Sequence, residues 1–126
     1  MDYRDLAFLA SGSAVAIEIY LNGDKSENHF SQNVEKLSEE VGRLSKRDGY
    51  DFGNILMLAE IIWPNRKDWK DGAVDGVYLQ ANLLAKELRC FNELSRERQI
   101  ELRDVCLKVS NLASRNCRRD YYGLVA

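Results

Sequence analysis

The chain is poor in the residues that build catalytic and metal sites. Its 126 residues include a single histidine, His29, one proline and three cysteines. Zinc needs clustered nitrogen and sulfur ligands, but His29 lies far from cysteines that are themselves separated by ten or more residues. The sequence has no Glu-x-x-His pair of the kind that holds iron between helices, and no glycine-rich phosphate loop. We therefore expect no metal, no cofactor and no enzymatic activity.

Targeting signals are also missing. The apolar N-terminal stretch, residues 6–21, is interrupted by small residues and by Glu18, which argues against a membrane span. It follows two acids and one arginine, the wrong charge for a signal peptide. The cysteines are odd in number, and Cys106 falls on an apolar helical stripe, where a free thiol packs as a small hydrophobe. We expect a cytoplasmic protein without a membrane partner.

What the chain does have is the composition of a folded domain. It is 45% hydrophobic and 30% charged, with a net charge of −2, which is close to the averages of globular proteins. A chain of this length suits one domain, residues 1–126, because it can bury a core without disulfides. No linker and no repeating period divides it.

The N-terminal apolar segment has two interpretations. Alternation typical of a strand is shown by Val15, Ile17, Ile19 and Leu21, whereas helical spacing is shown by Leu6, Ala10, Ser13, Ile17 and Tyr20. Asn22-Gly23 then forms either a hairpin turn or a helix C-cap. Residues 24–33 are too polar to supply the returning strand. We therefore predict a helix that ends at Gly23.

Three later segments show the three- and four-residue spacing of amphipathic helices. The first stripe is formed by Phe30, Val34, Leu37, Val41 and Leu44. The second is formed by Val74, Val77, Ala81, Leu84 and Leu88, with Tyr78 and Ala85 beside it. The third, capped by Asn92 or Ser95, is formed by Leu102, Val105, Cys106, Val109, Leu112 and Ala113. The tail that begins at Arg118 is predicted to leave this last helix.

Residues 52–63 are apolar on nearly every side, as in the central helix of a bundle. Pro64 ends this segment, since proline disfavours helical geometry at the residue before it. Glu60 is the exception within it, and a buried acid must pair, take up a proton or serve a function. A carboxylate site around Glu60 is the enzymatic alternative. The simpler interpretation is that Glu60 reaches the surface or pairs with a base.

Together these segments predict an all-α fold. Short connections between about five helices favour a compact bundle in which most neighbours are antiparallel.

Two stretches combine basic and aromatic side chains, the types enriched at the hot spots of protein interfaces. The first comprises Trp63, Arg66, Lys67, Trp69 and Lys70. The second is a possible C-terminal docking arm, residues 118–126, with Arg118, Arg119, Tyr121, Tyr122 and Leu124. Either stretch could instead cover the protein's own core. The arm suits a protein partner or a second copy of the chain, which would make a homodimer.

Two functions compete. The first is a non-enzymatic protein-binding module, an inhibitor, immunity factor or adaptor that blocks or organises a macromolecular partner. The chain resembles phage-encoded inhibitors and bacterial immunity proteins in size and charge alone, without a shared motif. The second is a nucleic-acid-binding regulator that uses bases along and after the last helix: Arg96, Arg98, Arg103, Lys108, Arg115, Arg118 and Arg119. Glu97, Glu101 and Asp104 on that helix weaken its attraction for phosphate, so we favour the first function.

Overall fold

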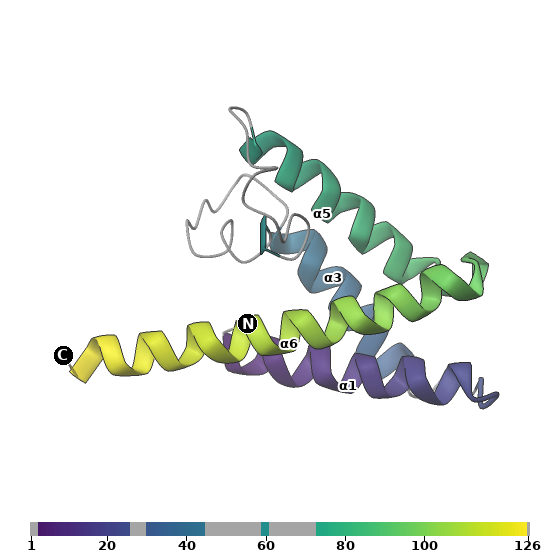
Figure 1. The fold of residues 1–126 in the computed structure, drawn as a ribbon, viewed down its shortest axis with the longest axis horizontal. Coiled ribbons are helices and arrows are strands. Elements are labelled where there is room, and N and C mark those ends of the chain that lie inside the picture. The colour runs from purple at the N-terminus through teal and green to yellow at the C-terminus, as the bar shows by residue number, and fades with distance from the viewer. Residues whose placement is uncertain (1–2, 26–29, 45–58, 61–72, 126) are drawn as a thin grey trace.

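A computed structural model of the chain describes residues 3–25, 30–44, 59–60 and 73–125. These residues form four α-helices: α1 (Tyr3–Leu21), α3 (Glu35–Leu44), α5 (Ala73–Arg89) and α6 (Arg96–Val125). A short π-helix, η1 (Phe30–Val34), leads into α3, and a 3₁₀ turn, η3 (Phe91–Glu93), connects α5 to α6. No strand occurs in these parts of the chain, which confirms the predicted all-α class (Figure 1).

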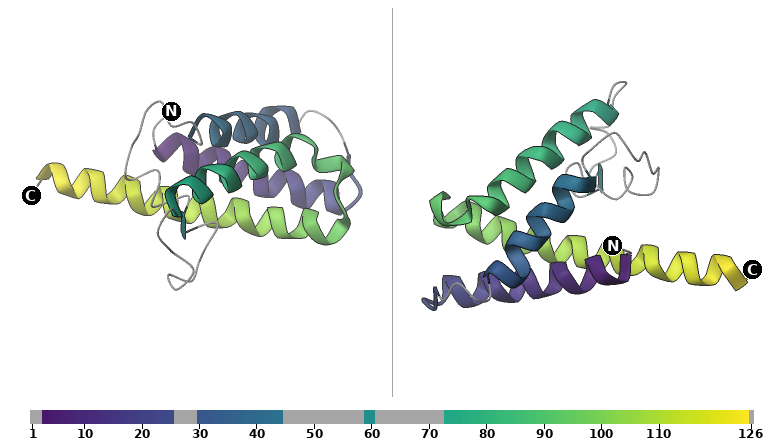
Figure 2. Two further views of the ribbon diagram at one scale, coloured as in Figure 1. Left: turned by 90° about the horizontal axis from the view of Figure 1, so that it is seen from above. Right: turned by 180° about the vertical axis from the view of Figure 1, so that it is seen from behind.

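The helices form two antiparallel pairs. α1 packs along α6, and α3 packs along α5, as Figures 1 and 2 show from three sides. The two pairs cross, with η1 and α3 in contact with α1. Turn η3 closes the sharp corner at which the chain passes from one pair to the other. The predicted antiparallel bundle is confirmed for these neighbours.

The N-terminal segment is a helix, as predicted, and Gly23 ends it. Gly23 has a φ of 105°, in the left-handed region that favours glycine. The Gly23 amide donates to the Tyr20 carbonyl, and the Asp24 amide donates to the Ile19 carbonyl. This pair of hydrogen bonds is the Schellman motif, which satisfies the last carbonyls of a helix. The strand interpretation of residues 14–21 is therefore excluded.

One hydrophobic core joins both pairs. Its fully buried members include Ile17 of α1, Leu37 of α3, Ala81 of α5 and Leu102 of α6. Each lies on the apolar stripe predicted for its segment. Phe30 and Val105 are only partly buried at the edge of the core.

Aromatic rings close one end of the core, where α1, η1 and η3 meet. The ring centroids of Tyr20, Phe30 and Phe91 lie 4.9–5.3 Å apart. Arg96, the first residue of α6, donates to the Leu21 carbonyl at 3.5 Å. The cation thus faces the negative C-terminal end of α1, whose own last turn has no basic residue. These contacts hold the C-terminal end of α1 beside the start of α6.

The structure does not bear out two of the predictions. The count of about five helices is not confirmed, because the predicted helix over residues 52–63 lies outside the described residues except for Ala59 and Glu60. The prediction that the tail leaves the last helix at Arg118 is wrong, since α6 continues to Val125. The physical reason is that no proline occurs between residues 96 and 125, and the only glycine there is Gly123.

Candidate interaction surfaces

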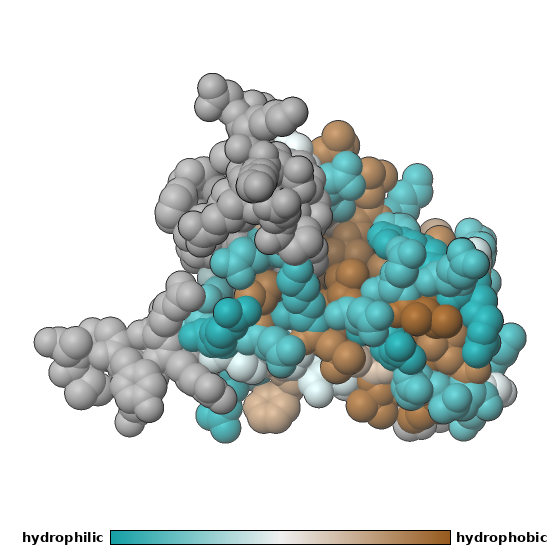
Figure 3. Space-filling model, in the orientation of Figure 1, coloured by the Kyte–Doolittle hydropathy of each residue, from teal (hydrophilic) through white to brown (hydrophobic). Residues whose placement is uncertain are grey.

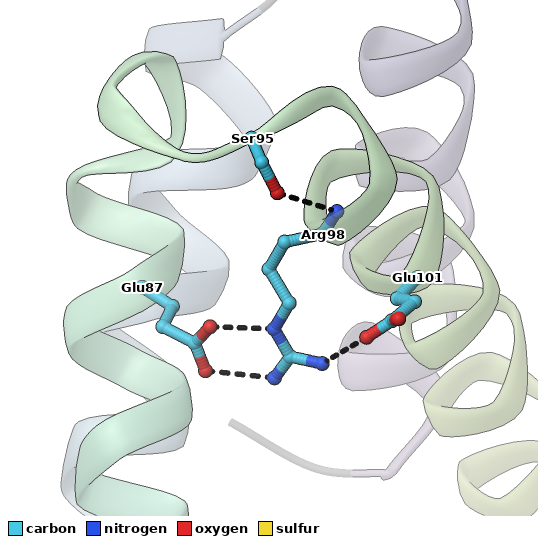
Figure 4. A network of polar contacts seen from close by, with 4 residues as sticks. All are labelled: Glu87, Ser95, Arg98 and Glu101. Carbon is cyan, nitrogen blue, oxygen red and sulfur yellow. Dashed lines mark hydrogen bonds and ion pairs between the residues drawn. The ribbon is translucent and has the colours of Figure 1, made fainter.

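A polar network fixes the corner between α5 and α6 (Figure 4). The Ser95 hydroxyl accepts a hydrogen bond from the Arg98 amide at 3.2 Å, as an N-cap does, which confirms one of the two predicted caps. The Arg98 side chain forms a two-pronged ion pair with Glu87, with N–O distances of 2.5 and 2.8 Å. It also donates to Glu101 at 2.7 Å. These bonds, that to Glu87 above all, raise the pKa of Arg98 above its ordinary value.

A second ion pair joins α6 to α1. Arg103 donates to the Glu18 carboxylate at 2.7 Å and lies 3.4 Å from the Asp104 carboxylate. The bond to Glu18 raises the pKa of Arg103. Two of the bases offered for phosphate binding, Arg98 and Arg103, are therefore held by carboxylates of the protein itself. A nucleic acid would have to displace these partners, which argues against the regulator function.

The predicted C-terminal arm is the end of α6, and it projects from the bundle. The Ser110 hydroxyl donates to the Ala7 carbonyl at 3.0 Å, and α1 begins four residues earlier, at Tyr3. Because the two helices are antiparallel, α6 passes the start of α1 near Ser114 and then continues to Val125. Figures 1 and 2 show these last turns extending past α1 with no other described helix beside them. Arg118, Arg119, Tyr121, Tyr122 and Leu124 all belong to this projecting segment.

The other predicted surface lies outside the described residues. It comprises Trp63, Arg66, Lys67, Trp69 and Lys70. The structure therefore does not place the two predicted stretches relative to each other.

No family model, curated protein sequence or solved structure matches this chain. The argument about function therefore rests on the protein's own surface.

Sequence reasoning missed five large apolar side chains that face solvent. They are Phe8 and Val15 on α1, Leu79 and Leu83 on α5, and Leu107 on α6. A signal for two of them was present in the first helix. Once the core stripe is drawn through Leu6, Ala10 and Ile17, helical geometry puts Phe8 and Val15 on the opposite side.

Groups with catalytic or metal-binding chemistry are few in the described part of the chain. Among those residues no group of three or more His, Cys, Asp and Glu side chains is placed to hold a metal ion. Cys106 is buried, and burial raises the pKa of its thiol to about 12. Glu60 is half-buried, and His29 lies outside the described residues. In the same part of the chain, no helix has the length and apolar character needed to cross a membrane.

Proposed function

We propose that this chain is a non-enzymatic protein-binding module, of the inhibitor, immunity or adaptor type, that binds and blocks or organises a macromolecular partner. The observation that carries the proposal is the projecting end of α6. Helical turns that no other described helix covers gain no stabilisation from packing against those helices, and short helices are only marginally stable in water. A partner that packs against these turns supplies the missing contact.

The composition of the projecting segment suits a protein partner. Tyrosine and arginine are enriched at interface hot spots, and the segment contains Arg118, Arg119, Tyr121 and Tyr122. Its single acid, Asp120, leaves a positive end on a chain whose net charge is −2. A partner with an acidic rim around an apolar groove is the complement of this segment.

The remaining parts of the proposal are based on the amino-acid sequence. Trp63, Arg66, Lys67, Trp69 and Lys70 are proposed as a second contact region. Cys90 and Cys106 are free thiols, which supports a reducing compartment such as the cytoplasm.

The proposal is tested by tagged pull-down from a lysate of the source cells, with and without nuclease, using the full chain. The test variant is Tyr121→Ala with Tyr122→Ala. The matched control is Asn111→Ala, an exposed change on the part of α6 that packs along α1. We expect the paired change to weaken binding of the captured protein by more than about 2 kcal/mol, the hot-spot scale, while the control leaves binding intact.

Circular dichroism separates loss of binding from loss of fold. We expect an unchanged helical signal and melting temperature in both variants, because Tyr121 and Tyr122 lie in the projecting segment and Asn111 is exposed on the bundle part of α6. Equal capture by both variants would contradict the role of the arm. Recovery of nucleic acid that disappears after nuclease treatment would instead support the regulator function.

A further inference from the structure

Helix α1 carries an ordered row of residues on the side opposite the core. The row, which we call the α1 outer stripe, is formed by Arg4, Phe8, Ser11, Val15 and Glu18. All five are exposed, and Phe8 and Val15 keep 70% and 57% of their surface in contact with solvent. The spacing of four, three, four and three residues is the spacing of a seam on which a second helix packs.

The stripe extends onto the neighbouring helix. Leu107 of α6 is 47% exposed and lies one turn after Arg103, which reaches across to Glu18. Leu107 therefore lies on the flank of α6 nearest to α1. In Figure 3, hydrophobic residues reach the lower edge of the molecule, where Figure 1 shows α1 beside α6. This gives the stripe an apolar centre that water contacts in the single chain.

The charges of the stripe suit a second copy of the same chain. A cation, Arg4, stands at one end and an anion, Glu18, at the other, with the small Ser11 midway between them. Glu18 already accepts from Arg103 of its own chain through Oε2, but its side chain is 49% exposed, so an incoming Arg4 can share this carboxylate through Oε1 without displacing Arg103. A twofold axis at Ser11 makes two such stripes antiparallel. Arg4 then lies opposite Glu18 of the partner subunit, and Phe8 lies within one residue of the level of Val15 of the partner subunit. A parallel pair would set like charges against each other at both ends.

We propose that the α1 outer stripe is the interface of a homodimer in which the two α1 helices cross antiparallel at Ser11. A twofold interface must be complementary to itself, and this stripe meets that condition in charge, in apolar contact and in the small residue at the crossing. The seam covers only two heptads, so the interface is small and the dimer dissociates in the micromolar range. This surface is separate from the projecting end of α6, and the proposal stands independently of the proposed partner.

Sedimentation equilibrium of the full chain over a concentration series tests the interface. We expect a reversible monomer–dimer equilibrium that Phe8→Glu weakens more than tenfold, because the new carboxylate would lie against Val15 of the partner subunit. The matched control is Leu79→Glu, the same change at a leucine of α5 that is 60% exposed. A wild-type chain that stays monomeric at the highest concentration overturns the proposal, as does equal weakening by the two variants.

Cross-linking tests the antiparallel register. In a background with Cys90→Ser and Cys117→Ser, the remaining native thiol, Cys106, is buried, so the new thiol has its own copy as the exposed partner. Glutathione disulfide supplied as oxidant takes up the two electrons and leaves as two molecules of glutathione. Ser11→Cys lies on the twofold axis and should form an intermolecular disulfide. Asn22→Cys, one turn beyond Glu18, is the matched control, since the two copies of residue 22 lie about 33 Å apart in the antiparallel pair. Cross-linking at residue 22 and not at residue 11 would overturn the antiparallel arrangement.

A further variant tests the two pairs formed by Arg4 and Glu18 of the partner subunit at the ends of the seam. Arg4→Glu puts like charges opposite each other at both ends of the seam, so we expect weaker dimerisation with an unchanged helical signal. A dimer of unchanged or higher affinity would contradict the pairing of Arg4 with Glu18 of the partner subunit. It would also contradict the proposal that a second copy binds this stripe. A third outcome is possible in principle: the wild-type chain is monomeric and captures another protein, and Phe8→Glu abolishes that capture. This outcome would overturn the homodimer and show that the α1 outer stripe binds that other protein.

Discussion

At the scale of single residues, the buried side-chain polar atoms of the described core are all bonded. Ser13 donates to the Leu9 carbonyl at 2.8 Å, and Ser38 donates to the Ala85 carbonyl at 2.6 Å. Gln99 donates to the Phe91 carbonyl at 3.0 Å, which ties α6 to the turn before it. No buried side-chain nitrogen or oxygen of the described residues lacks a partner. This is the condition under which polar groups can lie in a core without a large cost.

Cys106 gives a pH prediction at this scale. Burial raises the pKa of its thiol from an ordinary value of 9.0 to about 12. The neutral thiol therefore stabilises the fold fully below pH 9.0, and this contribution is lost as the pH rises through about 12. From about pH 8 to about pH 10.5, we expect the wild type to lose about 2 kcal/mol more unfolding free energy than Cys106→Ala.

Urea unfolding at the two pH values measures the difference. The comparison cancels the titration of lysines and tyrosines, because both chains contain them. Parallel pH profiles of the two chains would show that the thiol ionises as readily in the folded protein as in the unfolded one.

At the scale of elements, hydrophobic spacing predicted which segments are helices, and local chemistry predicted some of their ends. Gly23 ends α1 and Ser95 begins α6 through the hydrogen bonds that these residue types favour.

The end of α6 could not be predicted in this way. The predicted exit at Arg118 has no proline or glycine to mark it, so the helix continues past this residue. No pattern in the sequence predicted the π-helix η1 either. It lies where Asn33 approaches Gly12 so closely that a Cβ on Gly12 would be 2.6 Å from the Asn33 Oδ1.

Ser38 gives a prediction about the α3–α5 pair. Its hydroxyl bonds to a carbonyl of the other helix, whereas the Ser13 hydroxyl bonds within its own helix. We expect Ser38→Ala to lower the unfolding free energy by about 1 kcal/mol, and Ser13→Ala, the matched control, to lower it less. Thermal unfolding followed by circular dichroism compares the two variants. A larger cost for Ser13→Ala would mean that the inter-helical bond adds nothing to the pairing of α3 with α5.

At the scale of the whole molecule, the two helix pairs share one core. Leu37 belongs to the α3–α5 pair and Leu102 to the α1–α6 pair, and both are fully buried in the same cluster. A single core favours a single cooperative unfolding transition. The predicted single domain therefore has a direct test.

We expect Leu37→Ala and Leu102→Ala each to lower the unfolding free energy by about 2–5 kcal/mol, as large-to-small changes in a core do. Leu83→Ala on the exposed side of α5 is the matched control, with a cost below about 1 kcal/mol. Differential scanning calorimetry should show one transition in every variant, with the midpoint that circular dichroism reports. Separate midpoints in Leu37→Ala would show that the α3–α5 pair unfolds by itself.

By itself, the sequence determined the all-α class and the buried stripes of the described helices, because helical periodicity and capping depend on residues close together in the chain. Only the tertiary structure decided which helices pair, since Ser110 meets Ala7 and Arg103 meets Glu18 across long sequence separations. The exposure of Leu79, Leu83 and Leu107, the ion pair of Arg98 with Glu87 and the projection of the end of α6 depend on the same pairing. A side chain's availability to a partner is set by the neighbours that cover it, and those neighbours come from distant parts of the chain.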